Sequence, residues 1–381
     1  MRANKKFEWL FAIFTVLFFI AIKLPALTFR FSDGNAYIYM AQMILGGNLP
    51  YRDFFLADPP ALVLILTLLK FIFGTKIILF QAVPIILEAA TAVLLFLILK
   101  KRNNTLAFLA PFFYLFSFTI LATSDFLTGV QFVNFFAVWA IFLWEKNCPL
   151  ASGIIWSLAF LSKLYALPAL AAFVIFAAWR SDRDKLTKLA LGTLITTAAI
   201  MGPFLIMSFG KILDYLVLHQ FNRPAGLDRK TVFGFLIKKE WLLLFLGGVG
   251  ITVSKNKKAA LLFVALATFL LIFKDIYYNY FGVLMPYLII LSMEIIESGY
   301  IKIKESPGVA TVAILMLSLF YVNTFADYYR NFFNKSQFLN LTEIAVYIKT
   351  LPPDTPLYGS HEFVPLVALE SDRKIFNNYI D

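Results

Sequence analysis

The 381-residue chain is poor in several residue types that soluble proteins use freely. Charged residues make up only 15% of it, against about 25% in an average soluble domain. It holds one cysteine, Cys148, and two histidines, His219 and His361. The single cysteine excludes a disulfide framework within the chain, and the scarcity of both residue types disfavours a cysteine or histidine metal cluster.

Apolar residues take the place of the missing charge. They make up 60% of the chain, and the mean hydropathy is +0.78. A lipid bilayer is the natural solvent for this excess, so we expect an integral membrane protein. The net charge of +11 would suggest nucleic acid in a soluble protein. Here the basic residues lie mainly in short loops between apolar runs, as membrane topology signals do, and nucleic acid is disfavoured.

Many of these apolar runs approach the roughly 20 residues that a helix needs to cross a bilayer. Residues 150–179 are too long for one helix, and the polar pair Ser162 and Lys163 predicts two short helices that break there. The total is about eleven spans, which is an all-α polytopic bundle. The other expected spans are residues 7–27, 77–99, 105–121, 126–144, 186–209, 241–253, 259–273, 280–296 and 309–322.

The short run at residues 61–73 decides the predicted topology. If the N-terminus is cytoplasmic and this run does not cross, the basic clusters at residues 100–102, 180–188 and 255–258 all lie inside, as the positive-inside rule requires. If it crosses, they all lie outside. We therefore predict an interfacial or re-entrant helix on the outer face. One outer loop, residues 211–239, breaks the rule because it is rich in Lys and Arg.

The last part of the chain is polar and is expected to lie outside the membrane. Residues 1–322 would form the membrane domain, and residues 323–381 a small extracytoplasmic C-terminal region. A helix at residues 341–350 and short strands at 357–358 and 364–369 predict a small α/β tail. It is too short to build much core alone. Two interpretations stay open, a naturally short tail and a partial sequence.

The stretch from Ser32 to Pro60, just after the first span, is the best candidate for chemistry. Asp33 or Ser32 would cap a helix there, which explains the helix but leaves Asp53 and Asp58 unexplained. Both lie beside an apolar helix at the interface. A carboxylate in that setting is partly desolvated, so its pKa rises and it can act as a base. Two roles for Asp33 are therefore considered, the N-cap of the helix, which is the simpler one, and a catalytic base, which is the more specific one.

The order of features here resembles that of the GT-C superfamily of polyprenyl-phosphate-sugar-dependent glycosyltransferases. One span is followed by Asp33, a Tyr- and Ala-rich helix, the motif Gly-Asn-Leu-Pro-Tyr-Arg-Asp-Phe, and then Pro59, Pro60 and an apolar helix. The similarity is greatest to the branch of protein O-mannosyltransferases and the lipid A aminoarabinose transferase. It covers the layout of residues 7–322 and is specific in the first outer loop.

Two more segments resemble the family, and two positions depart from it. Ser162–Lys163 resembles a Thr-Lys step between two short helices, and residues 277–286 resemble a His-Tyr-x-x-x-x-Pro segment with Tyr in place of His. Many relatives have Asp-Glu where this chain has Asp33–Gly34, and many have Lys where it has Asp58.

The resemblance implies transfer of a sugar from a polyprenyl-phosphate donor to a lipid, glycan or protein acceptor at the outer face of the cell membrane. Asp33 would be the base that deprotonates or orients the acceptor hydroxyl. Cations would stabilise the phosphate leaving group, and arginine suits this because its fork binds two oxygens. A simpler role for such loop cations is contact with lipid headgroups. The candidates are Arg52, Lys163, Arg223, Arg229, Lys230 and Lys274.

A set of acidic and tyrosine side chains near the predicted outer ends is expected to line the substrate cavity. An interfacial tyrosine belt is the simple alternative for the tyrosines, and an N-cap of the next span is the alternative for Asp125. No cofactor is expected. The aspartate spacing is not a D-x-D metal motif, so a divalent metal is unsupported. The cavity candidates are Tyr37, Tyr51, Asp53, Asp58, Asp125, Tyr277 and Tyr280.

Two other functions compete with the transferase. A transporter or lipid flippase often shows repeated halves with broken helices in matching positions, and this chain shows no such symmetry. A non-catalytic scaffold gives no reason for the polar cluster between Asp33 and Pro60. His361–Glu362 begins like a zinc-protease motif, but Pro365 stands where its second His belongs. The sequence leaves the sugar, the acceptor and the oligomeric state open.

Overall fold

A computed structural model describes residues 5–25, 27, 32–74, 76–102, 104–180, 183–253, 257–303, 307–331, 333 and 340–378. Within these ranges the chain is helical, and β-pairing is limited to two isolated bridges, Pro50–Phe54 and Leu357–Ile375. Parts of the predicted cytoplasmic loops (residues 181–182, 254–256 and 304) and of the predicted tail (332, 334–339 and 379–381) lie outside the described residues.

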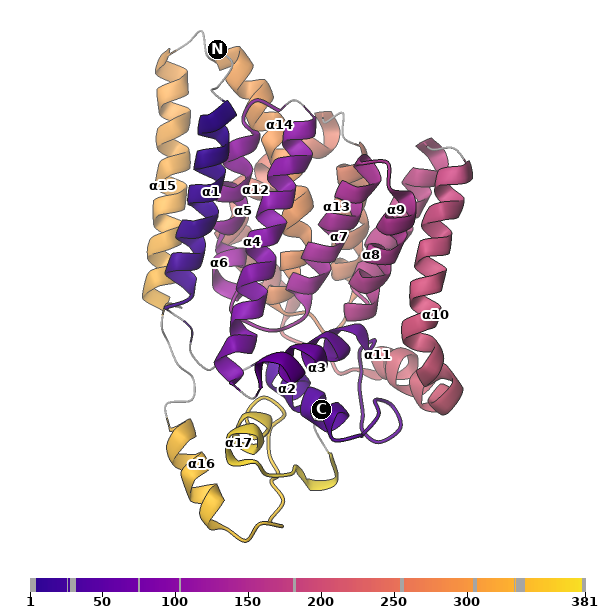
Figure 1. The fold of residues 1–381 in the computed structure, drawn as a ribbon. Helices are drawn as coiled ribbons and strands as arrows, with labels where there is room; N and C mark the ends of the chain where they lie inside the picture. Colours follow the sequence, from indigo (N-terminus) through magenta and orange to yellow (C-terminus); the bar gives the residue numbers. More distant parts are fainter. Residues whose placement is uncertain are drawn as a thin grey trace.

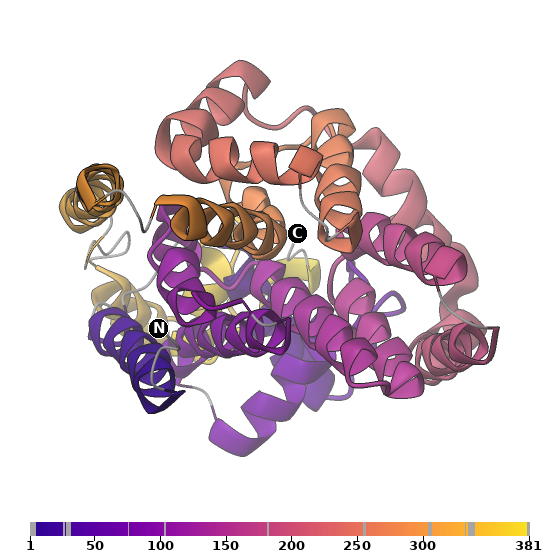
Figure 2. The same ribbon diagram turned by 90° about the horizontal axis from the view of Figure 1, so that it is seen from above.

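The long helices stand side by side and form an upright bundle, as Figure 1 shows from the side and Figure 2 from above. The N-terminus lies at the upper end of Figure 1, and the C-terminal region lies below the lower end. The helices of the bundle are α1 (Lys5–Lys23), α4 (Ile77–Lys101), α7 (Val130–Glu145), α8 (Pro149–Ser162), α9 (Ala166–Arg180), α10 (Arg183–Leu213), α12 (Arg229–Val253), α13 (Lys257–Ile272), α14 (Met285–Ile303) and α15 (Pro307–Asn331).

The predicted span at residues 105–121 is a broken segment rather than one helix. It contains η1 (Ala107–Leu109), α5 (Ala110–Leu115) and α6 (Phe118–Thr123). Ser117 is extended, with φ −62° and ψ 147°, so the helical hydrogen bonds stop between α5 and α6. As a result α6 is a separate short helix that contacts η3 (Tyr278–Leu284).

The predicted break at Ser162–Lys163 is confirmed. The helix α8 ends at Ser162, α9 begins at Ala166, and Lys163 between them is extended, with φ −156° and ψ 136°. A second interruption lies within α12, where Glu240 has non-helical angles of φ −117° and ψ 19°. Its Oε1 accepts a hydrogen bond of 2.6 Å from the backbone N–H of Thr119. The kink separates the predicted short span at residues 241–253 from the part of α12 that precedes it.

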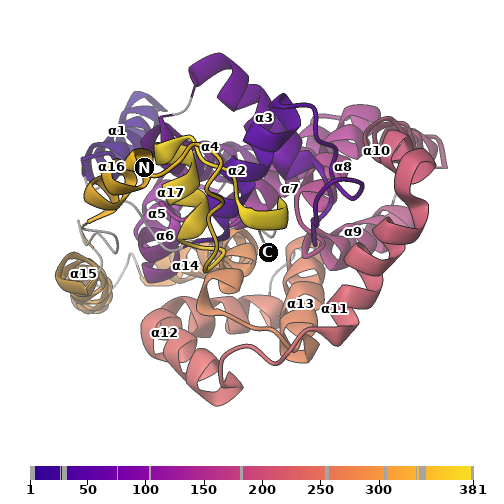
Figure 3. The ribbon, with the colours of Figure 1, turned by 90° about the horizontal axis from the view of Figure 1, so that it is seen from below.

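Two short helices lie across the lower end of the bundle. They are α2 (Asp33–Leu45) and α3 (Ala61–Phe73), and α3 has the bounds of the predicted non-crossing run. Figures 1 and 3 show both beneath the ends of the upright helices. On the side of α10, the chain continues through η2 (Asp214–Leu218) and α11 (His219–Asn222) at this same end. The lower end is therefore built from segments distant in sequence.

The C-terminal region is helical, which corrects part of the sequence prediction. The helix α16 (Leu341–Thr350) is confirmed with its predicted bounds. The predicted strand at residues 364–369 is wrong, because these residues belong to α17 (Val364–Ser371), which Pro365 opens in its first turn. A short apolar run does not by itself separate a buried strand from a buried helix. The one named element beyond α17 is the short 3-10 helix η4 (Phe376–Asn378).

The division at residues 322 and 323 stays a prediction, because α15 continues through that point to Asn331. Three helical stretches of the described residues are long and apolar enough to cross a membrane: Ile77–Lys101, Arg183–Asn222 and Tyr278–Tyr300. Shorter apolar helices at Ala61–Phe73, Val130–Glu145, Pro149–Ser162 and Ala166–Arg180 accompany them. These findings support a membrane protein, and the count of about eleven spans stays a prediction.

Candidate functional site

A cavity of about 520 Å³ lies at the lower end of the bundle, beside α2. Segments from the whole length of the chain contribute to its wall: the start of α2, the turn before α7, the link between α8 and α9, the loop after α11, η3, and the turn before α17. The lining residues are Ser32, Asp33, Tyr37, Phe126, Thr128, Lys163, Tyr165, His219, Arg223, Pro224, Asp275, Tyr277, Tyr278, Asn279, Tyr280, His361 and Glu362.

Asp33 lines this cavity at the first turn of α2. The N-cap of the helix is Ser32, whose Oγ accepts a hydrogen bond of 3.1 Å from the backbone N–H of Gly34. Because Ser32 caps α2, the capping role considered for Asp33 is filled by its neighbour. The Asp33 side chain is 42% exposed, and its Oδ1 lies 3.9 Å from His361 Nε2. The carboxylate is thus accessible from the cavity.

Close packing explains the glycine that follows Asp33. Many members of the GT-C superfamily, which this chain resembles, carry Glu at this position. A Cβ atom at Gly34 would lie 2.5 Å from Leu127 Cβ and 2.6 Å from the Leu127 carbonyl oxygen. Real Cβ atoms do not approach other atoms this closely, so the backbone of the turn before α7 leaves no room for a side chain. The first turn of α2 is therefore held directly against that turn.

Lys163 enters the cavity wall from the link between α8 and α9, and it is only 4% exposed. Its Nζ donates hydrogen bonds of 2.6 Å to Asp58 Oδ2 and to the hydroxyl oxygen of Tyr37. The Tyr37 hydroxyl donates to the same Asp58 oxygen at 2.6 Å. A buried charge needs a partner of opposite sign, and Asp58 supplies it here. The Asp58 carboxylate therefore neutralises much of the charge that Lys163 brings to the cavity.

The turn before α7 supports Lys163 from its other side. Gly129 has φ +87°, and a Cβ atom there would lie 2.8 Å from Lys163 Cγ. Both the left-handed backbone and the close approach require a glycine at this position. The Lys163 side chain is thus fixed by packing as well as by its ion pair.

Arg223 brings the second cation to the cavity, from the loop after α11. Its Nη1 donates to Asp275 Oδ2 at 3.1 Å, and the two side chains are 17% and 16% exposed. Burial alone lowers the pKa of the Arg223 guanidinium, but facing acidic groups, Asp58 and Asp275 among them, outweigh burial and raise this pKa. Arg223 therefore stays cationic. Its remaining N–H groups can bind an anion, because a guanidinium carries five donors.

Tyrosines form the wall between these charges. The rings of Tyr165 and Tyr280 lie 4.7 Å apart between centroids, and those of Tyr277 and Tyr280 lie 5.8 Å apart. Burial, and next the nearby Asp275 carboxylate, raise the pKa of the Tyr277 hydroxyl, so it stays protonated at neutral pH. The rings are tilted or edge-on to one another, and together they offer apolar faces and hydrogen-bonding hydroxyl groups. Such a wall suits the alternating apolar and polar surfaces of a sugar.

The C-terminal region completes the cavity through His361 and Glu362. It is held on α2 by two hydrogen bonds that the helix provides. The Asn35 side-chain amide donates to the Glu362 carbonyl oxygen at 2.6 Å, and the Ile375 N–H donates to the Tyr39 hydroxyl oxygen at 2.9 Å. Figure 3 shows α17 in front of α2 when the lower end is viewed from below. The region therefore covers the side of the cavity at which Asp33 lies.

Two oxygens on the cavity wall have no hydrogen-bond partner among the described residues. They are Thr128 Oγ1 and Asn279 Oδ1, and both atoms are buried. Buried polar atoms are nearly always paired in native structures, so exceptions call for an explanation.

Four of the predicted cavity residues lie outside the lining. Tyr51 is fully buried at a positive φ of 65°, and its hydroxyl donates to the Asp58 carbonyl oxygen at 2.7 Å. Asp53 pairs with Arg52 at 2.7 Å on the surface. Asp58 lies behind the wall, bound to Lys163. Asp125 is neither on the wall nor the cap of α7, which is Gly129; it pairs with Lys23 at 2.9 Å.

Four of the predicted phosphate-binding cations also lie outside the lining. Arg52 is tied to Asp53, and this hydrogen bond raises the pKa of the guanidinium. Arg229 caps the end of α13, donating to the carbonyl oxygens of Leu271, Ile272 and Phe273 at 3.1–3.2 Å. Lys230 and Lys274 are exposed and absent from the wall. Of the six cations, the structure brings Lys163 and Arg223 to the cavity.

Several lining residues were missed from the sequence. Asp275 directly follows the predicted cation Lys274 in the sequence, but its ion-pair partner is Arg223, about 50 residues earlier in the chain. Tyr165 follows the predicted break by two residues. His361 and Glu362 have only the start of a metal motif as a local signal, and nothing in the sequence places residues so distant beside Asp33. Among the described residues, no group of three or more His, Cys, Asp or Glu side chains could hold a metal ion.

Comparison with known proteins identifies the fold. No protein-family model and no curated protein matches the sequence. The structure is similar to ArnT from Cupriavidus metallidurans bound to undecaprenyl phosphate, with a TM-score of 0.68 and 13% identity over 98% of this chain and 86% of that one. The apo structure of the same protein gives a TM-score of 0.70, with the same identity and coverage. ArnT is the lipid A aminoarabinose transferase, a GT-C enzyme, so the predicted GT-C resemblance is confirmed at the level of the fold.

Proposed function

We propose that this chain is a membrane glycosyltransferase that moves a sugar from a polyprenyl-phosphate donor to an acceptor hydroxyl. The observation that carries the proposal is the distribution of charge in the cavity. An accessible carboxylate, Asp33, a buried cation, Lys163, and a half-buried cation, Arg223, share one space of about 520 Å³. The fold adds support, because the similar ArnT structure holds undecaprenyl phosphate.

The reaction assigns a role to each group. The acceptor oxygen attacks the anomeric carbon, its proton passes to the Asp33 carboxylate, and the bond from that carbon to the phosphate oxygen breaks. The electron pair leaves with the phosphate, where charge grows in the transition state. Fixed cations aimed at developing charge are the most effective form of such stabilisation. Both cations are paired with a carboxylate, Lys163 with Asp58 and Arg223 with Asp275. Arg223 is the main candidate, because a guanidinium carries five donors and can bind a phosphate while it donates to Asp275.

The lower end of the bundle would face the outside of the cell in this proposal. The basic ends of α4, α9 and α13 gather at the opposite end, where Arg102, Arg180, Lys257 and Lys258 line a common pocket. The positive-inside rule places that end in the cytoplasm. The N-terminus of α1 lies at the same end (Figure 1), so it would be cytoplasmic.

Replacing Asp33 with Asn tests the proposal. The purified protein is given a panel of undecaprenyl-phosphate sugars with a lipid extract as acceptor source, and the released undecaprenyl phosphate is measured by mass spectrometry. We expect Asp33→Asn to lower the rate by about 10²- to 10⁴-fold, the usual contribution of a general base. Binding of undecaprenyl phosphate should be unchanged, because the base does not contact the phosphate.

A matched control separates catalysis from helix capping. Ser32→Ala removes the cap of α2 and should lower the free energy of unfolding by about 1 kcal/mol. Asp33→Asn should leave thermal unfolding near that of the wild type. Full transfer activity in Asp33→Asn would reject Asp33 as the base, and failure of the wild type to bind undecaprenyl phosphate would reject the donor class.

A further inference from the structure

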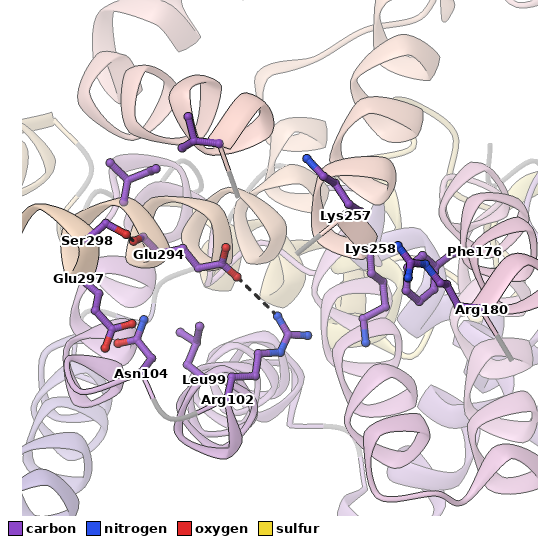
Figure 4. Close-up of a pocket in the computed structure, with 12 residues that line it drawn as sticks. Leu99, Arg102, Asn104, Phe176, Arg180, Lys257, Lys258, Glu294, Glu297 and Ser298 are labelled. Carbon is purple, nitrogen blue, oxygen red and sulfur yellow. Dashed lines mark hydrogen bonds and ion pairs between the residues drawn. The ribbon is translucent and has the colours of Figure 1, made fainter. Parts of the chain in front are cut away.

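A second cavity, of about 740 Å³, lies at the opposite end of the bundle from the candidate active site. The end of α4, the end of α9, the start of α13 and the last part of α14 surround it. Figure 4 shows Lys257, Lys258 and Arg180 together on one wall, Glu294, Glu297 and Ser298 on the other, and Arg102 between them. Neither the sequence predictions nor the proposed reaction uses this cavity.

The carboxylates around this cavity are already engaged. Glu145 accepts hydrogen bonds from Arg102 and from Lys258, the second at 2.8 Å. Glu297 accepts from the backbone N–H and the hydroxyl of Thr105. Glu294 lies 3.9 Å from Arg102 Nη1. The half-buried Arg102 and the buried Lys258 are therefore both paired with carboxylates of the protein itself.

The other two cations of the wall are not compensated. Among the described residues, no carboxylate lies within ion-pair distance of Arg180 or Lys257. Arg180 is exposed and stacks on Trp179, with 4.8 Å between the guanidinium carbon and the ring centroid. Lys257 is exposed and begins α13, so it stands at the positive end of a helix dipole. The mouth of the cavity thus carries uncompensated positive charge from two helices.

The surroundings of the mouth are apolar. Trp179 is 73% exposed and Val253, which lines the cavity, is 62% exposed. Both lie at the ends of bundle helices, the level at which lipid headgroups meet the protein. Exposed tryptophan is typical of this level of a membrane. Basic pockets between membrane helices on the cytoplasmic side are suited to phosphate-bearing headgroups.

We propose that this cavity binds a phosphate group through Arg180 and Lys257, with Arg102 and Lys258 behind them. The chemistry is shared by two sources, the headgroup of an anionic phospholipid and free phosphate. The apolar rim favours the lipid. This site is separate from the candidate active site and does not depend on the proposed transferase activity.

The test uses the full chain in nanodiscs made from an equal mixture of phosphatidylcholine and phosphatidylglycerol. The preference of the protein for phosphatidylglycerol is measured with spin-labelled lipids. We expect Arg180→Gln/Lys257→Gln to reduce this preference by about 25-fold, because each cation near the surface contributes about fivefold. The single variant Lys257→Gln should show about a fivefold loss. Both side chains are exposed, so thermal unfolding should be unchanged.

The control is Lys146→Gln/Lys188→Gln, which removes the same charge from the same end outside the cavity, and it should keep the wild-type preference. A second arm titrates inorganic phosphate into the protein in nanodiscs of phosphatidylcholine alone. Phosphate binding that disappears in Arg180→Gln/Lys257→Gln would support the site and assign it to a soluble ligand. Equal losses in the two double variants, or no loss in either arm, would overturn the proposal.

Discussion

At the scale of single residues, the contact between Lys163 and Asp58 is the least expected feature of the site. The resembling family often has Lys where this chain has Asp58, and the sequence alone does not show which group the aspartate contacts. The structure pairs the two side chains at 2.6 Å, with side-chain exposures of 4% and 10%. In the proposed reaction, this pair makes Arg223 the main phosphate-binding candidate, and Lys163 would position Tyr37.

This pairing predicts an asymmetric response to mutation. Lys163→Met leaves the Asp58 carboxylate buried without a partner, and breaking a buried pair in this way costs about 3–5 kcal/mol. Lys163→Met/Asp58→Asn removes both charges and should recover most of the loss. Thermal unfolding in detergent measures both variants. Equal unfolding temperatures for the single and the double variant would show that the ion pair contributes little.

The cations show how far single residues could be predicted. Six were proposed for the phosphate, and Lys163 and Arg223 reach the cavity. Arg229 instead caps α13, a role that depends on where a helix about 40 residues further along the chain ends. Residue type and the predicted side of the membrane were enough to select the six candidate cations. Whether each one reaches the cavity, a helix end or the surface depends on the three-dimensional path of the chain.

At the scale of helices, α8, which ends just before Lys163, packs closely on α10 through its first part. A Cβ atom at Gly192 would lie 2.2 Å from the Leu150 carbonyl oxygen, and one at Gly153 would lie 2.1 Å from the Leu189 carbonyl oxygen. The two helices therefore approach each other through reciprocal glycines. Ser157 adds a hydrogen bond of 2.9 Å to the Thr193 carbonyl oxygen.

The glycine contact gives a prediction with a control in the same helix. Gly192→Ala should lower the free energy of unfolding by about 1–3 kcal/mol, because the added methyl group forces the backbones apart. Gly202→Ala, also in α10, meets nothing within 4 Å and should be neutral or stabilising by up to about 1 kcal/mol. Thermal unfolding compares the two. A loss in Gly202→Ala as large as in Gly192→Ala would contradict close packing as the cause.

The helices also show which elements the sequence could predict. The break at Ser162–Lys163, the helix at residues 61–73 and α16 are predictable from local signals of polarity, length and periodicity. The strand predicted at residues 364–369 fails because a short buried helix has the same apolar pattern. The placement of α17 on α2 depends on contacts between residues more than 300 positions apart, and no local signal reports them.

At the scale of the whole molecule, the two cavities lie at opposite ends of one bundle, and the single cysteine can report which end faces the cytoplasm. Cys148 is exposed and lies between α7 and α8, at the end with the basic cavity. A membrane-impermeant maleimide should label it only after the cells are permeabilised. In the control Cys148→Ser/Lys230→Cys, the new cysteine should be labelled in intact cells. The reverse pattern would invert the proposed topology.

The central claim is that the cavity beside α2 holds a polyprenyl phosphate against Arg223. The most direct test measures binding of undecaprenyl phosphate to the wild type, Arg223→Gln and Arg229→Gln in nanodiscs. We predict that Arg223→Gln weakens binding by about tenfold or more, because a charge-assisted hydrogen bond to the phosphate is lost. Arg229→Gln, which removes a helix cap outside the cavity, should bind like the wild type. Equal binding by all three proteins, or none by the wild type, would contradict the claim.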